Sequence, residues 1–217
     1  MTSRERLLAA SRGGSLDLQP RLGWLSDDSG LDGSVVEDMS KMNRRDSESV
    51  VLVDVSNPFG LALQKGIDLN KALKDDPSVG SEVLDSLVEE VRQRISLSLE
   101  LGADGIFYRL HGACPRHCSP MQYGGHYLER DRELLGGASE AFLNVLFVAG
   151  EDELYIDFVS DLPAQVFAWD SELTNVSAQD VRAARTGAVA SSDPSSEIEL
   201  VIGIKNYIDN LEQPNLG

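Results

Sequence analysis

Short apolar runs and amphipathic segments alternate along this chain. The run "VVLVDV" at residues 50–55 is β-branched and almost continuously apolar, which is typical of a strand buried on both faces. Residues 81–101 instead repeat apolar side chains at helical spacing, with most charged side chains off that face, and Gly102 follows as a C-cap. The pattern therefore predicts a protein that mixes strands with helices.

The remaining runs extend this alternation. We predict about six strands, at residues 21–25, 50–55, 105–109, 142–149, 164–169 and 187–191. The predicted helices are a short N-terminal one and segments at residues 61–65, 68–74, 81–101, 119–135, 153–158, 177–185 and 195–211. The polar stretch 26–49 has no strong period, so we predict a loop there with at most one helical turn.

This element order predicts the fold class. Strands that alternate with helices are usually parallel and joined by helical crossovers. A complete (β/α)8 barrel needs eight strands, so about six predict an α/β fold of the abridged or incomplete TIM-type barrel, with an open sheet as the alternative. The whole chain, residues 1–217, is expected to form a single domain.

Composition narrows the classes of partner and compartment. The net charge of −17 argues against nucleic acid and against an anionic membrane surface, since both need clustered Lys and Arg. No apolar run reaches the ~18 residues of a membrane span, and the N-terminal segment lacks the long apolar stretch of a signal peptide. With only two cysteines, the chain is expected in the reducing cytoplasm, acting on a small-molecule substrate.

Polar residues stand where the predicted strands end. In parallel α/β folds these carboxyl ends carry the functional site. Asp54, His111 and Asp170 are therefore candidate catalytic residues for proton transfer, and Arg109 is a candidate anchor for a substrate carboxylate. Further polar residues at predicted strand ends are Asp27, Ser56, Asn57 and Asp193.

Each candidate also has a structural interpretation. Asp54 lies inside an apolar strand, where it serves either a site or a structural salt bridge. Asp170 and Asp193 are also common turn-forming and helix-capping types. Trp24 and Trp169 are candidate substrate contacts, although packing in the core or at its rim is the commoner use of tryptophan.

All three histidines and both cysteines of the chain lie between residues 111 and 126, in "HGACPRHCSPMQYGGH". Three interpretations are open: a polar strand-to-helix loop, a metal site, and a catalytic role for His111 or Cys114. A structural zinc site usually needs two ligand pairs separated by a spacer, which this run lacks. Adjacent His117 and Cys118 also suit a single tetrahedral ion poorly. The loop is the favoured interpretation, and no metal ligand is assigned.

Several segments together resemble the uroporphyrinogen decarboxylase superfamily. The N-terminal "SRERLLAASRGGSLDLQPRLGW" resembles the family's opening helix, glycine and strand. The middle section matches in "NPFGLALQKG" and "LNKALKDDPSVGSEVLDSLVEEVRQRISLSLELGADGIFY". "CSPMQYGGHYLERDRELLGGA" and "FLNVLFVAGEDELYIDFVSDLPAQVFAWD" resemble the helix and strands that follow. The resemblance is one of pattern and covers most of residues 3–190.

This resemblance implies a (β/α)8 barrel with one of two activities. One branch decarboxylates the acetate arms of uroporphyrinogen without a cofactor, and the other transfers methyl groups between corrinoid proteins and thiols with a zinc ion. The zinc branch has His-x-Cys where this chain has Phe147, Val148 and Ala149, so the family's zinc ligands are absent and no cofactor is expected. Gln64 stands near the position of a decarboxylase tyrosine.

Two further positions bear on the resemblance. Arg109 and Leu110 stand where the decarboxylases have a serine, and Arg21 is a loose counterpart of their paired arginines. We therefore expect Arg21 and Arg109 to bind substrate.

The first functional hypothesis is a decarboxylase-like enzyme acting on a carboxylated substrate such as a tetrapyrrole. The alternatives are a corrinoid-dependent methyltransferase-like enzyme with its metal moved to the loop 111–118, and a catalytically inactive relative that binds a ligand or partner. An incomplete barrel would expose sheet edges, so a homodimer is predicted.

Overall fold

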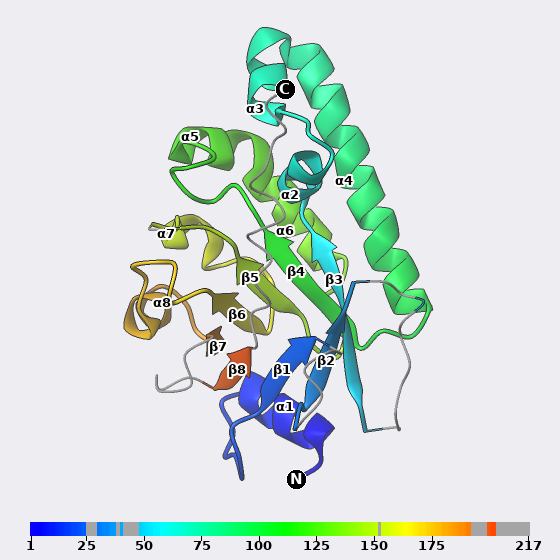
Figure 1. Cartoon of the computed structure of the whole chain (residues 1–217), viewed down its shortest axis with the longest axis vertical. Coiled ribbons are helices and arrows are strands. Elements are labelled where there is room, and N and C mark those ends of the chain that lie inside the picture. Colours follow the sequence, from blue (N-terminus) through cyan, green and yellow to red (C-terminus); the bar gives the residue numbers. More distant parts are fainter. Residues whose placement is uncertain (25–29, 38–39, 41–47, 152, 192–198, 203–217) are drawn as a thin grey trace.

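Eight parallel strands close into a barrel in the computed structural model of this chain (Figure 1). The structure describes residues 1–24, 30–37, 40, 48–151, 153–191 and 199–202. Each strand pairs with the next, and β8 pairs with β1 to close the ring. The strands are β1 (Arg21–Trp24), β2 (Gly33–Val36), β3 (Val50–Ser56), β4 (Gly105–Leu110), β5 (Val145–Val148), β6 (Val166–Trp169), β7 (Ala188–Ser191) and β8 (Leu200–Ile202).

Helices surround this barrel, and the longest, α4, runs along its outside (Figure 1). Most begin at a residue whose side chain caps the first turn, as Thr2, Asp76 and Ser177 do. No described helix is both long enough and apolar enough to cross a membrane. The helices are α1 (Ser3–Ser11), α2 (Pro58–Gln64), α3 (Leu69–Asp75), α4 (Pro77–Glu100), α5 (Pro120–Gln122), the π-helix η2 (Tyr123–Tyr127), α6 (Leu128–Gly136), α7 (Ile156–Val159) and α8 (Ala178–Ala184).

The strands divide the core into two apolar layers. Successive side chains of a strand point to opposite faces. In β3, Leu52 packs inside the barrel, whereas Val51 and Val53 belong to the outer layer under the helices. In β4, Phe107 faces inward and Tyr108 outward. This alternation also fixes which polar side chains reach the barrel mouth.

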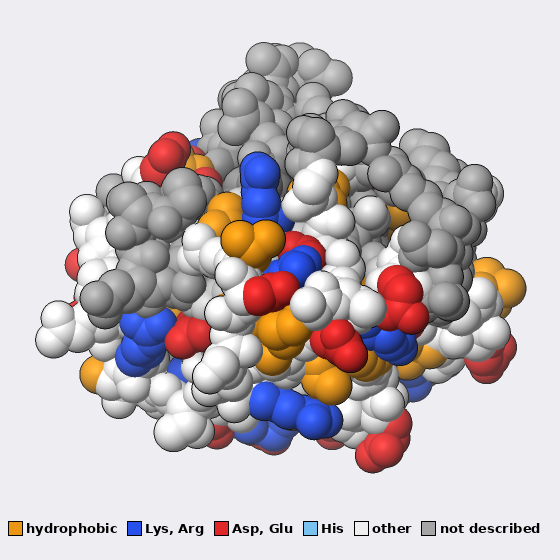
Figure 2. Space-filling model, turned by 90° about the horizontal axis from the view of Figure 1, so that it is seen from below, with side chains coloured by type: hydrophobic (Ala, Val, Ile, Leu, Met, Phe, Trp, Pro, Cys, Tyr) orange, Lys and Arg blue, Asp and Glu red, His pale blue; other side chains and the backbone are white. Residues whose placement is uncertain are grey.

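Helix α1 closes the end of the barrel where the strands begin (Figure 1). Leu7 and Ala10 are fully buried in the same cluster as the barrel interior. Arg4 donates to Asp104 at 2.8 Å, and Arg6 forms an ion pair with Asp32. Viewed from this end, acidic and basic side chains lie interspersed (Figure 2), so α1 is held to the barrel by both burial and ion pairs.

The predicted TIM-type barrel with parallel strands is confirmed, and all six predicted strands occur. The strand count was nevertheless two short. β2 was missed because its four residues, Gly-Ser-Val-Val, follow a polar stretch and show no clear period. β8 was missed because residues 200–202 also fit the helical spacing predicted for 195–211. Residues 195–198 and 203–211 of that predicted helix lie outside the described residues.

The barrel is shortened in its connections rather than in its strands. Between β1 and β2 the described residues 30–32 contain no helix. Because β8 pairs with β1, the sheet has no open edge, and the edge-covering reason for a homodimer is wrong. The homodimer itself stays a prediction.

Gly105, the first residue of β4, allows a close approach that no other residue would permit. A Cβ there would lie 1.9 Å from the carbonyl oxygen of Leu143. We expect Gly105→Ala to lower the free energy of unfolding by about 2–3 kcal/mol, since the obstacle is backbone. Urea denaturation checks this. Gly136→Ala is the control, because a Cβ in that exposed helical position meets nothing within 4 Å. Equal stability of the two variants would contradict the close approach.

Candidate functional site

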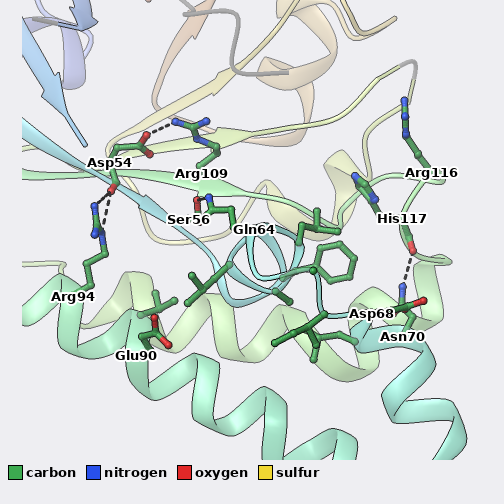
Figure 3. A pocket seen from close by; sticks show the side chains of 18 of the residues that line it. Asp54, Ser56, Gln64, Asp68, Asn70, Glu90, Arg94, Arg109, Arg116 and His117 are labelled. Atoms are coloured by element: carbon green, nitrogen blue, oxygen red, sulfur yellow. Dashed lines mark hydrogen bonds and ion pairs between the residues drawn. The ribbon is translucent and has the colours of Figure 1, made fainter. Parts of the chain in front are cut away.

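A cavity of about 970 Å³ lies at the carboxyl ends of β2, β3 and β4 (Figure 3). Its other walls come from α2, α3, α4 and the loop after β4. Strand ends supply Glu37, Asp54, Ser56 and Arg109. Helix α2 supplies an apolar wall with Phe59, Leu61, Ala62 and Leu63. The cavity therefore combines charged strand ends with an apolar side.

The sequence turns sharply from strand to helix beside this cavity. Asn57 ends β3 and caps α2, because its side chain accepts a hydrogen bond from the Gly60 amide at 2.9 Å. Pro58 occupies the first helical position, where its missing N–H has no consequence. The strand-ending signal in "SNPFG" thus directs α2 across the barrel mouth.

Asp54 and Arg109 form a buried ion pair at the mouth (Figure 3). Both belong to the inward face of their strands, since Asp54 is two residues beyond Leu52 and Arg109 two beyond Phe107. Their side chains are only 8% and 5% exposed. Arg109 donates to Asp54 Oδ2, whereas Oδ1 has no hydrogen-bond partner among the described residues.

The charge state of Asp54 reflects two opposing effects. Burial raises the pKa of the Asp54 carboxyl above its usual value, and the positive charge of Arg109 opposes that rise. The two interpretations of Asp54, as part of a structural salt bridge and as a site residue, do not exclude each other. One oxygen is held by the salt bridge, and the other has no hydrogen-bond partner among the described residues.

Arg94 is a cavity residue that the sequence did not single out. It reaches from α4 to the ends of two strands and donates to the Asp54 carbonyl oxygen at 2.9 and 3.2 Å. It also donates to the Glu37 carbonyl oxygen at 2.6 Å. Its position off the apolar face of the long helix was the only sequence signal. Arg94 thereby fixes the ends of β2 and β3.

Gln64 and Ser56 also meet in the cavity. The Gln64 side chain donates to Ser56 Oγ at 2.8 Å (Figure 3). The position that resembles the decarboxylase tyrosine thus does line the cavity, although an amide replaces the phenol there.

His111 lies behind the cavity wall rather than in it. It is 7% exposed and packs against Gly60, whose position would place a Cβ 2.5 Å from the imidazole Cδ2. Its Nε2 has no hydrogen-bond partner among the described residues. Burial lowers the pKa of His111 to about 3, and the nearby Arg109 adds to that effect. The imidazole is therefore neutral and enclosed, and His111 is not among the described residues that line the cavity with Asp54.

The other predicted catalytic residue, Asp170, follows β6 and forms a turn. Its Oδ1 accepts hydrogen bonds from the amides of Glu172 and Leu173 at 2.9 and 3.2 Å. This matches the turn-forming alternative for Asp170. Asp27 and Asp193 lie outside the described residues.

Three predicted substrate-binding residues are placed away from the cavity. Arg21 is the first residue of β1, so it lies at the opposite end of the barrel from the carboxyl ends. Trp24 faces the barrel interior and packs edge-on against Phe107, with ring centroids 5.4 Å apart. Trp169 is 1% exposed in the outer layer and donates to the Val176 carbonyl at 3.0 Å. Of the predicted binding residues, Arg109 alone lines the cavity.

The His/Cys loop shows no metal-ligand cluster within the described part of the chain. Cys114 and Cys118 are buried thiols, and burial raises the pKa of each. Asn70 donates to the His117 carbonyl at 2.8 Å and so ties this loop to α3. At the family's zinc position, Phe147 stacks on Phe107 with centroids 5.5 Å apart.

A buried polar cluster on the outer face of the barrel was also missed. Asp131 of α6 is 1% exposed and binds the hydroxyls of Tyr108 and Tyr123 and the amide of Asn57. The only available signal was a carboxylate four residues after Tyr127 on the buried side of a predicted helix. Sequence spacing alone does not show that its partners come from three other elements.

Comparison with solved structures finds matches at low sequence identity. A methyltransferase from Methanosarcina mazei superposes with a TM-score of 0.74, covering 93% of this chain and 92% of that chain at 13% identity. A phosphoenolpyruvate phosphomutase from Streptomyces platensis subsp. rosaceus gives a TM-score of 0.44 at 12% identity, covering 95% of this chain and 82% of that one. No family model matches the sequence, and no curated protein does. At 13% identity, the first likeness establishes a shared fold.

Breaking the Asp54–Arg109 pair from one side should be costly. Arg109→Met leaves a buried carboxylate without its cation, and we expect the free energy of unfolding to fall by about 3–5 kcal/mol. The double variant Asp54→Leu/Arg109→Met removes both charges and should regain most of that loss. Chemical denaturation of the two variants checks the coupling. A double variant with the same free energy of unfolding as Arg109→Met would contradict this coupling.

His111 should make stability depend on pH. Its pKa is about 3 in the folded protein against 6.5 for a free histidine, so the unfolded state binds a proton first. The stabilisation is complete above pH 6.5 and is lost as the pH falls from 6.5 towards 3, by up to about 1.4 kcal/mol per pH unit. His111→Phe should flatten that decline in thermal melts, whereas exposed His126→Phe should not. Identical profiles for His111→Phe and the parent protein would refute the prediction.

Proposed function

We propose that this chain is a methyltransferase-like enzyme whose small-molecule ligand lies in the barrel-mouth cavity and donates a hydrogen bond to Asp54. One observation carries this proposal. Asp54 is buried with Oδ2 bound to Arg109 and with Oδ1 unpartnered among the described residues. A buried carboxylate oxygen without a donor is costly, and an N–H, O–H or S–H group of a ligand would supply the missing partner.

The charges that line the cavity favour a ligand without several carboxylates. Among the described residues the lining has four acidic side chains, Glu37, Asp54, Asp68 and Glu90, against three arginines, Arg94, Arg109 and Arg116. Each arginine already has a partner. Arg109 pairs with Asp54, Arg116 pairs with Glu151, and Arg94 binds the carbonyl oxygens of two strand ends. A polycarboxylate would have to displace these partners, which weighs against the decarboxylase-like hypothesis.

The likeness to a methyltransferase over nearly the whole chain supports methyl transfer as the chemistry. A methyl acceptor with an N–H, O–H or S–H group loses its proton as its lone pair bonds to the methyl carbon, and the leaving group takes the electrons of the broken bond. In this proposal Asp54 Oδ1 receives that proton, while Arg109 orients the carboxylate. The resemblance implies a corrinoid as methyl donor. No step here passes through a metal, since the described residues offer no zinc site.

Methyl transfer gives a direct test. The protein is mixed with methylcobalamin and 2-mercaptoethanol, and loss of the methyl–cobalt absorption is followed. We expect turnover, and Asp54→Asn should lower its rate by about 100-fold or more, the usual effect of removing a general base. Glu90→Gln is the matched control, because Glu90 lines the cavity but is exposed and pairs with Lys65. That variant should keep the parental rate.

A binding titration separates the competing functions. Trp24 does not line the cavity, but it packs against Phe107, two residues before Arg109, with ring centroids 5.4 Å apart, so a change in its fluorescence can report binding beside Arg109. Tricarballylate, a small tricarboxylate, should bind more weakly than the thiol. Tighter binding of the tricarboxylate would favour the decarboxylase-like hypothesis. Binding without turnover, unaffected by Asp54→Asn, would favour a catalytically inactive relative.

A further inference from the structure

Asn57 joins three parts of the cavity wall. Its backbone N–H donates to the Arg109 carbonyl at 2.9 Å. Its side-chain Oδ1 accepts from the amides of Gly60 and His111 at 2.9 and 3.1 Å, and its Nδ2 donates to the His111 carbonyl at 3.0 Å. One fully buried side chain therefore links the end of β3, the first turn of α2 and the turn after β4.

Asp131 holds this asparagine from the outer side of the barrel. Asn57 Nδ2 donates to the two Asp131 oxygens at 3.2 and 3.3 Å. The hydroxyl of Tyr108, from β4, donates to Oδ1 at 2.7 Å, and that of Tyr123, from η2, donates to Oδ2 at 3.0 Å. Arg130 and Arg132 flank Asp131 on the same helix; the side chain of Arg130 pairs with Asp85, and that of Arg132 pairs with Glu129 and Asp161. The groups that face the carboxylate are thus neutral donors.

The protonation state decides whether all these bonds can exist together. An ionised carboxylate has acceptor sites for every one of the three donors. A protonated carboxyl carries a hydrogen of its own, which the Asn57 amide nitrogen cannot accept. A tyrosine hydroxyl that accepts this hydrogen no longer donates to the carboxyl, and the Asn57 amide loses its charged acceptor, so the set of bonds is weakened. Burial raises the pKa of Asp131 to about 6, and the hydrogen bonds from Tyr108, Tyr123 and Asn57 only partly oppose that rise. Proton uptake therefore falls close to neutral pH.

We infer that Asp131 is a positioning residue: its ionised carboxylate holds Asn57 in place, and proton uptake loosens the α2 turn and the His111 turn that border the cavity. Phe59, Ala62 and Gln64 of α2 line the cavity, as does Arg109, whose carbonyl Asn57 binds. A carboxylate outside the cavity thereby controls its shape. The inference rests on the proposed function only in treating this cavity as the ligand site.

Amide hydrogen exchange measures how strongly the α2 turn and the His111 turn are protected, and it needs no ligand. The amides of Gly60 and His111 both donate to Asn57 Oδ1 and are the reporters. After correction for the intrinsic exchange rate, the parental protein should lose protection at both amides as the pH falls from 8 through 6. Asp131→Asn should be less protected by about tenfold at pH 8, the effect of one lost hydrogen bond to a charged group, and should show no such pH step.

Two further variants complete the experiment. Glu133→Gln removes an exposed carboxylate from the same helix and should leave both protection and its pH step unchanged. Tyr123→Phe keeps the carboxylate but removes one donor to it, so the pH step should move to higher pH. This variant serves the test even where Asp131→Asn fails to fold.

Some outcomes would overturn the inference. It is refuted by parental protection in Asp131→Asn, or by an unmoved pH step in Tyr123→Phe. Failure of methyl transfer alone would count against the proposed function, but not against the role of Asp131 in positioning Asn57. A second measurement connects this inference with the proposed function. Binding of 2-mercaptoethanol should weaken below pH 6 in the parental protein and equally in Glu133→Gln. Asp131→Asn should bind the thiol weakly at every pH.

Discussion

The in–out alternation of side chains along closed parallel strands is the constraint on which this structure depends. It places Leu52 and Phe107 in the barrel interior and Val51 and Tyr108 under the helices. Continued by two residues, the same alternation delivers Asp54 and Arg109 to the mouth from neighbouring strands. The ion pair is thus a consequence of register, and a slip of one residue would turn both charges into the outer apolar layer.

That constraint explains which parts of the fold could be predicted from sequence. Runs such as "VVLVDV" and the helical spacing of residues 81–101 are long enough to show their period. Both elements occur, although the helix begins at Pro77, four residues before the predicted start. β2 and β8 have four and three residues, which is too short for a period to emerge. Their place in the sheet is set by pairing with neighbours, as Leu22 pairs with Gly33 and with Ile202. Sequence spacing does not report such contacts.

The candidate site was predictable to the same extent. Asp54 and Arg109, which the ends of the predicted strands indicated, both line the cavity, because the end of a strand can be located from the sequence alone. A strand end does not show that the Asp170 side chain accepts a hydrogen bond from the backbone amide of Glu172, or that Trp169 faces the outer layer. Arg94 and Asp131 act from helices on strands far away in sequence. Residues of that kind become visible only when the packing of the outer layer is known.

Two buried carboxylates mark opposite sides of the same strand ends. Asp54 faces the mouth, shares its charge with Arg109 and keeps one oxygen unpartnered among the described residues. Asp131 lies on α6 outside the barrel and accepts hydrogen bonds from three neutral donors, Tyr108, Tyr123 and Asn57. Burial raises the pKa of both, but only the first has a cation to hold it ionised. In our proposals Asp54 therefore takes part in the chemistry, whereas Asp131 positions the backbone. Asn57 and the pairing of β3 with β4 connect the two carboxylates.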